Sequence, residues 1–179
     1  MIFGINIPEK KGTFRKLCKS IGQKNITEFS YRLDKTQEAK ILLGLEFTKG
    51  EKEKKSFIKS MKLKKYKITD LSDDEISKVH IRYMSGGRAP ELTNGETEEV
   101  FKVDFPERPG ALMQFLDLLK DKWNISLFHY KNQGAIYGGA LVGFSIKGSQ
   151  LNKLNKDLLN TEYPFTRVSE NASYKAFLK

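Results

Sequence analysis

The sequence is poor in the residues that usually carry disulfides, catalysis or membrane insertion. Its 179 residues contain one cysteine, Cys18, and two histidines, so an internal disulfide is impossible and a reducing, cytoplasmic setting is expected. No apolar run approaches the ~20 residues that span a bilayer, and residues 1–5 lack the basic start and long apolar core of a signal peptide. The remaining composition, 39% hydrophobic and 30% charged, is typical of a folded, soluble protein.

The few candidate catalytic side chains are expected to pack rather than react. Cys18 lies between Leu17 and Ile21 on an apolar helix face, His80 falls on another apolar stripe, and His129 alternates with aromatic residues in a strand. Neither histidine has a Cys, Asp or Glu at metal-ligand spacing. Phosphate-loop and nucleophile-elbow motifs are also missing. No set of residues therefore supports the interpretation that this chain is an independent enzyme, and no metal or cofactor is expected in it.

The net charge of +10 raises the question of a nucleic-acid partner. Only six of the 32 basic residues are Arg, the side chain whose planar fork binds phosphates and guanine edges. The many lysines are therefore interpreted as a solvated surface. A polyanion site is the alternative.

The most informative feature is an internal repeat. Residues 5–14, INIPEKKGTF, return as residues 103–112, VDFPERPGAL. After one inserted residue the match continues from 25–32 to 124–131. Because this period is far too long for a solenoid unit, the chain is predicted to contain two copies of one small domain.

Each copy has the same predicted order of elements. In the first copy, period-two alternation indicates strands and helical spacing indicates helices: strands 2–7, 26–33, 39–48 and 66–69, and helices around 14–21 and 57–61. The second copy repeats this pattern with strands 100–105, 125–131, 138–146 and 165–168, and helices around 112–119 and 151–158. Strand, helix, strand, strand, helix, strand is the ferredoxin-like βαββαβ order. An α+β fold of two such subdomains with antiparallel sheets is predicted.

A connecting helix is predicted between the copies. Ser72 and Glu75 have the spacing of a capping box, and an apolar stripe follows at helical spacing: Ile76, Val79, His80, Tyr83 and Met84. This stripe is expected to be buried at the joint. The predicted division is a first subdomain over 1–71, a connecting helix and loop over 72–98, and a second subdomain over 99–179.

The repeated Pro-Glu-x-x-Gly loop is the best candidate binding feature. It lies between a strand and a helix, so its amides and the helix N-terminus favour a carboxylate. Glu9 and Glu107 could hold an ammonium group, and Gly12 and Gly110 permit close backbone approach. A zwitterion with an apolar side chain among Leu112, Phe115 and Leu141 would suit such a site. In the alternative interpretation, Pro and Gly only form the turn and Glu is solvated.

Several segments resemble a known family. Residues 7–12, 27–32, 70–75 and 80–88, and above all 105–112 and 123–130, are similar to the regulatory region of biosynthetic threonine dehydratase (threonine ammonia-lyase). The resemblance covers nearly the whole chain. It implies two ACT-like subdomains behind a catalytic domain that carries pyridoxal phosphate and converts threonine to 2-oxobutanoate and ammonia. It also implies inhibition by isoleucine, opposition by valine, and a homo-oligomer that is usually a tetramer.

The loop and the resemblance together give the expected effector-binding residues, with the loop contributing Glu9, Gly12, Glu107 and Gly110. The expected effector-binding residues are Glu107, Gly110, Leu112, Phe115, Leu116, Tyr130 and Leu141 in the second copy, and Glu9, Gly12, Phe14, Tyr31 and Arg32 in the first. The chain begins at the regulatory region, so the lysine-bearing catalytic domain is expected to be absent and the chain itself is not expected to be an enzyme. An excised regulatory region and a free-standing regulatory protein both fit. Isoleucine, valine, the catalytic domain and further copies are the expected partners, without nucleic acid or membrane.

The alternative of a different class is an RNA-binding protein, because RRM domains use the same element order. Residues 137–144 resemble the RRM stacking strand, but Gly139 and Leu141 stand where its aromatic residues belong.

Overall fold

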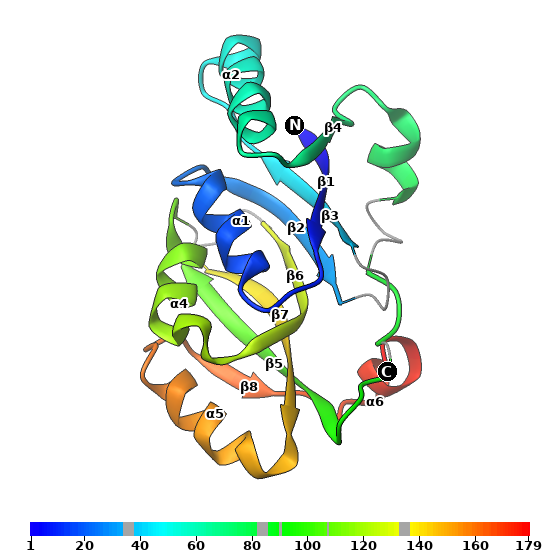
Figure 1. Ribbon diagram of the computed structural model, residues 1–179, viewed down its shortest axis with the longest axis vertical. Helices are drawn as coiled ribbons and strands as arrows, with labels where there is room; N and C mark the ends of the chain where they lie inside the picture. Colours follow the sequence, from blue (N-terminus) through cyan, green and yellow to red (C-terminus); the bar gives the residue numbers. More distant parts are fainter. Residues whose placement is uncertain (34–37, 82–85, 90, 107, 133–136) are drawn as a thin grey trace.

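Eight strands form one antiparallel sheet with the order β4-β1-β3-β2-β6-β7-β5-β8 (Figure 1). The computed structural model describes residues 1–33, 38–81, 86–89, 91–106, 108–132 and 137–179. Its strands are β1 (Ile2–Pro8), β2 (Ile26–Arg32), β3 (Glu38–Leu45), β4 (Lys67–Asp70), β5 (Glu96–Pro106), β6 (Asn124–Lys131), β7 (Tyr137–Lys147) and β8 (Phe165–Arg167). Its α-helices are α1 (Thr13–Ile21), α2 (Gly50–Leu63), α4 (Ala111–Leu119), α5 (Leu151–Leu159) and α6 (Ala172–Phe177). Short helical turns occur at η1 (Ser77–Ile81), η2 (Lys120–Lys122) and η3 (Gly148–Gln150).

The element order confirms the predicted fold class. Each half contains strand, helix, two paired strands, helix and a final strand, and every strand pair is antiparallel. The two halves also share a sheet, because β2 pairs with β6 through partners such as Ser30 and His129. The sequence predicted two packed copies but not this strand pairing.

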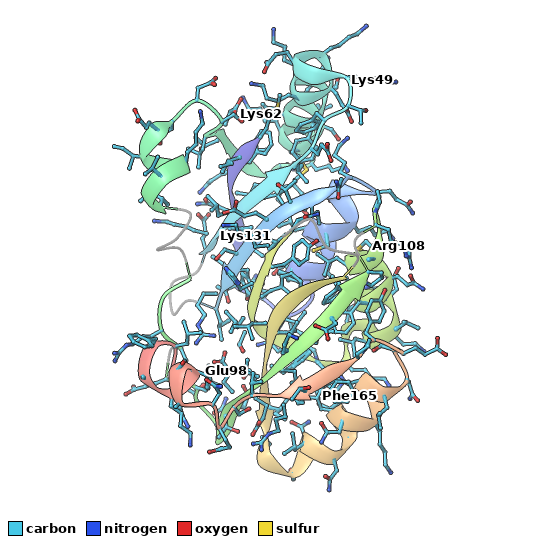
Figure 2. The ribbon with its side chains drawn as sticks, turned by 180° about the vertical axis from the view of Figure 1, so that it is seen from behind. Lys49, Lys62, Glu98, Arg108, Lys131 and Phe165 are labelled. Atoms are coloured by element: carbon cyan, nitrogen blue, oxygen red, sulfur yellow. The ribbon has the colours of Figure 1, made fainter. Side chains whose placement is uncertain are left out.

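One face of the sheet and the helices above it enclose the main core. Seen from behind, the strands lie in front of α1 and α4 (Figure 2). At the joint between the halves, the ring of Phe128 on β6 lies 5.4 Å from Phe14 and 5.5 Å from Phe29 of the first copy, and 6.1 Å from Phe105 of the second. Such ring contacts stabilise a core beyond the area that they bury. Phe128 therefore joins the two copies beneath the β2–β6 pair.

The opposite face carries a buried ion pair between the copies. The Arg32 guanidinium on β2 lies 2.8 Å from the Glu98 carboxylate on β5, and the two side chains are only 6% and 5% exposed. Ser126 and Tyr174 also donate to Glu98, and Arg32 donates to the carbonyl oxygen of Leu178 at 2.7 Å. The C-terminal helix α6 is thereby attached to both halves. Tyr174 packs against this face, as expected for the tail, whereas Phe177 is exposed.

The predicted buried stripe of the connecting helix is wrong for the residues that can be described. The described part of the segment is a helical start at residues 75–76 followed by the π-helical turn η1, and Ile76 and Val79 are 62% and 50% exposed. The predicted capping box is also wrong. The Ser72 hydroxyl accepts from the backbone of Ile2 on β1, and Asp74 caps the helix by accepting from the amide of Ile76. The Ser72 side chain therefore binds the backbone of β1 and does not cap the helix.

Other expectations for this region have separate outcomes. Tyr83, Met84 and the side chain of His80 lie outside the described residues. β5 begins at Glu96, just before the predicted boundary at 99, and the division into 1–71, 72–98 and 99–179 stays a prediction. Cys18 is buried as expected, but His129 is exposed, since it lies on the sheet face opposite α1 and α4.

The joint and the connecting segment should respond differently to substitution. Phe128→Ala should lower the free energy of unfolding by about 3–5 kcal/mol, because it leaves a cavity between the copies. Val79→Asp should change it by less than about 0.5 kcal/mol, because the side chain is exposed. Urea unfolding of both variants measures the difference. A loss for Val79→Asp as large as that for Phe128→Ala would contradict this view of the connector.

The buried ion pair gives a second stability test. Glu98→Ala should cost about 3–5 kcal/mol, because it leaves the Arg32 guanidinium buried without its charge partner. Glu38→Ala is the control, since Glu38 pairs with Lys67 where both side chains are well exposed, and solvent screens such pairs. Equal urea midpoints for the two variants would show that Arg32 and Glu98 do not hold the copies together.

Candidate functional site

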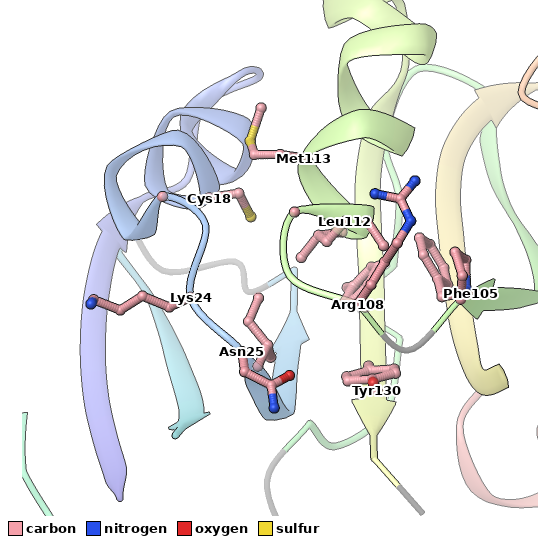
Figure 3. A pocket seen from close by; sticks show the side chains of 14 residues that line it. Cys18, Lys24, Asn25, Phe105, Arg108, Leu112, Met113 and Tyr130 are labelled. Carbon is pink, nitrogen blue, oxygen red and sulfur yellow. The ribbon is translucent and has the colours of Figure 1, made fainter. Parts of the chain in front are cut away.

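A pocket opens between the two copies, close to the end of α1 and the start of α4 (Figure 3). This inter-copy pocket has about 530 Å³ of empty space, a volume that includes open solvent. Its walls are largely apolar: Cys18, Ile26, Phe105, Leu112, Met113, Phe128 and Tyr130. Its remaining lining residues are Gly22, Lys24, Asn25, Pro106, Arg108, Gly110 and Ala111. Both copies contribute to it, so it exists only because they are joined.

The N-terminus of α4 gives the pocket an anion-binding end. Gly110 precedes the helix with a φ of 84°, a left-handed conformation that favours glycine, and provides no side-chain cap. The Ala111 amide donates to the Arg108 carbonyl oxygen within the loop. The next amides of the first turn have no acceptor inside the helix, and the helix dipole adds partial positive charge. A carboxylate at the Gly110 end of the pocket would be stabilised by both effects.

Asn25 supplies an acceptor on the opposite side of the pocket. Its amide nitrogen donates to the Glu46 carboxylate at 2.6 Å, and its backbone carbonyl oxygen accepts from the Glu46 amide. These contacts fix the side chain so that its carboxamide oxygen lies on the side nearer Tyr130 (Figure 3). An ammonium group in the pocket could donate to that oxygen.

Lys24 borders the pocket but its ammonium group is engaged elsewhere. Its Nζ lies 2.7 Å from Glu53 and over the rings of Phe47 and Phe57, and Figure 3 shows it pointing away from the pocket. Pyridoxal phosphate needs a lysine amine that can reach its aldehyde, so this pocket does not suit that cofactor. In the described part of the chain, no three His, Cys, Asp or Glu side chains form a possible metal site, and no described helix is long and apolar enough to cross a membrane.

The equivalent position in the first copy is bridged by ion pairs. Gly12 precedes α1 with a φ of 86°, and a smaller hollow, lined by residues of both copies and with about 340 Å³ of empty space that includes open solvent, lies beside it. Arg15 spans this first-copy hollow, since its guanidinium lies 2.5 Å from Asp117 and 2.8 Å from Asp121. Lys11 also donates to the carbonyl oxygen of Lys122 at 2.9 Å. The same loop thus faces an open pocket in the second copy and a bridged hollow in the first.

The predicted effector residues fall in several places. Gly110, Leu112 and Tyr130 line the inter-copy pocket, and Gly12, Phe14 and Leu116 line the first-copy hollow. Phe115 is fully buried against Phe105 and Tyr163. Arg32 and Leu141 lie on the opposite face of the sheet, with Glu98 and with the cluster around Val100 and Leu127. Glu107 lies outside the described residues, and the effector role of all twelve stays a prediction.

Glu9 and Tyr31 are engaged with each other. The Tyr31 hydroxyl lies 3.4 Å from the Glu9 carboxylate and 3.2 Å from the carbonyl oxygen of Ile125. Burial, and then the nearby Glu9 charge, raise the pKa of Tyr31 above its ordinary value. This pair connects the first-copy loop to β6 of the second copy.

Residue-by-residue prediction missed several lining residues, above all Asn25, Arg108 and Ile26. The signal for Asn25 was the repeat itself, because Asn25-Ile26-Thr27 returns as Asn124-Ile125-Ser126. Arg108 lies inside the predicted loop, between the candidate residues Glu107 and Gly110. Neither signal indicated that one copy would complete the site of the other.

Comparisons with known proteins show which family the chain belongs to. The family model for the C-terminal regulatory domain of threonine dehydratase matches residues 1–81 and 91–178. The biosynthetic L-threonine dehydratase IlvA of Burkholderia multivorans is 41% identical over 177 residues, which are 99% of this chain and 34% of that protein. Its counterpart from Escherichia coli is 39% identical over 177 residues, again with 99% and 34% covered. The chain thus spans about a third of the length of these curated relatives.

A solved structure of aspartate kinase from Synechocystis aligns with a TM-score of 0.46 and 14% identity, covering 92% of this chain and 28% of that one. The family model and the curated relatives decide the assignment. The chain belongs to the family of C-terminal regulatory domains of threonine dehydratase.

Proposed function

We propose that this chain is an allosteric module that binds isoleucine, and valine more weakly, in the inter-copy pocket. Through that binding it controls the deamination of threonine to 2-oxobutanoate by a catalytic domain that carries pyridoxal phosphate. The observation that supports this proposal is the combination in one pocket of a helix N-terminus, a polar acceptor and apolar walls. A zwitterion with a branched apolar side chain matches each of these parts.

The ligand would lie across the joint between the copies. Its carboxylate would face the start of α4 near Gly110, and its ammonium group would donate to the Asn25 oxygen. Its side chain would pack among Ile26, Leu112 and Phe128, all of which line the pocket. Burial of a branched side chain contributes roughly 1.5–3 kcal/mol. Isoleucine therefore gains more from this site than smaller amino acids do.

Binding could become a signal because the ligand would contact both copies. Asn25 and Ile26 come from the first copy, and Gly110 and Leu112 come from the second. A ligand that fits one arrangement of the copies better shifts the equilibrium by its differential affinity, commonly about 1–3 kcal/mol. The catalytic domain and neighbouring chains of a homo-oligomer would sense that arrangement.

Isothermal titration of the purified chain should show one isoleucine per chain. Valine lacks one methylene, so its affinity should be lower than that of isoleucine by roughly tenfold or more. Threonine should have the lowest affinity of the three, because its hydroxyl would face apolar walls. Poly-U serves as the control for the RNA-binding alternative and should give no saturable heat. Equal affinity for threonine and isoleucine, or no isoleucine binding at all, would contradict the proposed function.

A matched pair of glycine variants locates the site. Alanine at Gly110 or at Gly12 meets the same left-handed backbone, with φ of 84° and 86°, and should cost about 1–2 kcal/mol of stability in either copy. Gly110→Ala should also weaken isoleucine binding about tenfold or more, because its strain disturbs the α4 amides that would hold the carboxylate. Gly12→Ala should leave the affinity within about threefold, since the first-copy hollow is bridged by Arg15. The reverse pattern would move the site to the first copy.

A further inference from the structure

Arg108 forms a partition between the inter-copy pocket and a groove on its outer side. Arg108, Gly110 and Met113 line both, and the outer groove of about 780 Å³ is completed by Gln23, Pro109, Gln114, Asp117 and Leu118. Figure 3 shows the Arg108 side chain at the pocket rim, with its guanidinium beside the start of α4. The guanidinium donates to the carboxamide oxygen of Gln114, one turn into that helix. Both side chains are exposed, so this contact can exchange at little cost.

The Gln114 side chain is itself held from the other side. Its carboxamide oxygen lies 3.5 Å from the hydroxyl of Tyr163, whose single hydrogen goes either to it or to the closer carbonyl oxygen of Ala111 at 3.1 Å. Tyr163 is buried and packs against Phe105 and Phe115. The buried Tyr163 therefore helps to fix the position of the Gln114 oxygen that accepts from Arg108.

Arg108 has no permanent acidic partner in the described part of the chain. The acidic side chain that lines the same outer groove, Asp117, is paired with Arg15 at 2.5 Å. A neutral amide oxygen is a weaker acceptor than a carboxylate, because charge-assisted hydrogen bonds are roughly twice as strong. A carboxylate that enters the pocket would therefore replace Gln114 as the acceptor of the Arg108 guanidinium.

We propose that Arg108 recognises the carboxylate of the amino-acid ligand, and that Gln114 is the positioning residue that holds its guanidinium at the pocket rim until the ligand arrives. This inference rests on the proposed function and adds to it the group that recognises the ligand's charge. The first copy has no such pair. Lys10 and Lys16 occupy the positions that match Arg108 and Gln114 in the repeat, and two ammonium groups, which have no acceptor, cannot hold one another.

Gln114→Glu tests the exchange directly. The new carboxylate gives Arg108 a built-in ionic partner in place of the neutral amide, so isoleucine must compete with it. Titration should show affinity about tenfold lower than in the parent, since charge-assisted hydrogen bonds are roughly twice as strong as neutral ones. Lys16→Gln is the matched control, because it makes the same change of one charge unit at the same helical position of α1. It should bind isoleucine within about twofold of the parent.

A double-mutant cycle separates competition for Arg108 from simple charge repulsion. Arg108→Gln alone should weaken isoleucine binding about tenfold, and Gln114→Glu in that background should then add less than about threefold. Thermal melts of all variants should match the parent, because every substituted side chain is exposed. If Gln114→Glu changes the isoleucine affinity equally in the parent and in the Arg108→Gln background, or in neither, the proposed exchange is overturned. The proposed function would still stand. A parent chain that binds no isoleucine would overturn both.

Discussion

The pairing of β2 with β6 is the interaction on which the rest of the molecule depends. It converts two four-stranded sheets into one of eight strands, and it is supported on both faces. Beneath it, Phe128 packs on Phe14 and Phe29. Above it, the buried Arg32–Glu98 pair crosses from one copy to the other. Because this joint also places α1 beside α4, it creates the inter-copy pocket, which neither copy could form alone.

The duplicated chain uses one local structure in two ways. Both copies place a glycine in the left-handed region at the end of the loop and start a helix there. The surroundings differ, because Arg15 bridges the first-copy hollow with Asp117 and Asp121, whereas Arg108 in the second copy rests on a neutral glutamine. The two loops are equivalent in the repeat, and they differ in the charged side chains that surround them.

Much of the fold could be predicted from the sequence, because strand alternation and helical spacing are local signals that the repeat displays twice. The β2–β6 pairing could not, since alternation does not say which strand edges meet. The prediction of a buried connecting helix was wrong for a related reason. Ile76 and Val79 have helical spacing, but spacing alone does not provide a surface to bury them.

The candidate site was predictable only in part. The loop and Gly110, Leu112 and Tyr130 were found from the repeat and the family resemblance, whereas Asn25 and Arg108 needed the geometry of the joint. The prediction that Tyr31 and Arg32 share one site conflicts with their being neighbours in a strand. Successive strand residues point to opposite faces, and Arg32 accordingly lies on the face with Glu98. Phe115 lies on the apolar face of its helix, and the structure buries that face in the core.

The most direct test of the central claim is an isoleucine titration of the chain followed by the backbone amide signals in NMR spectra. If the ligand enters the pocket at the joint, the largest shifts should occur together in residues 24–26 of the first copy and 108–113 of the second. The signals of residues 12–15 and 117–121 around the first-copy hollow should move much less. Largest shifts around that hollow, or on the sheet face that carries Arg32, would contradict the account.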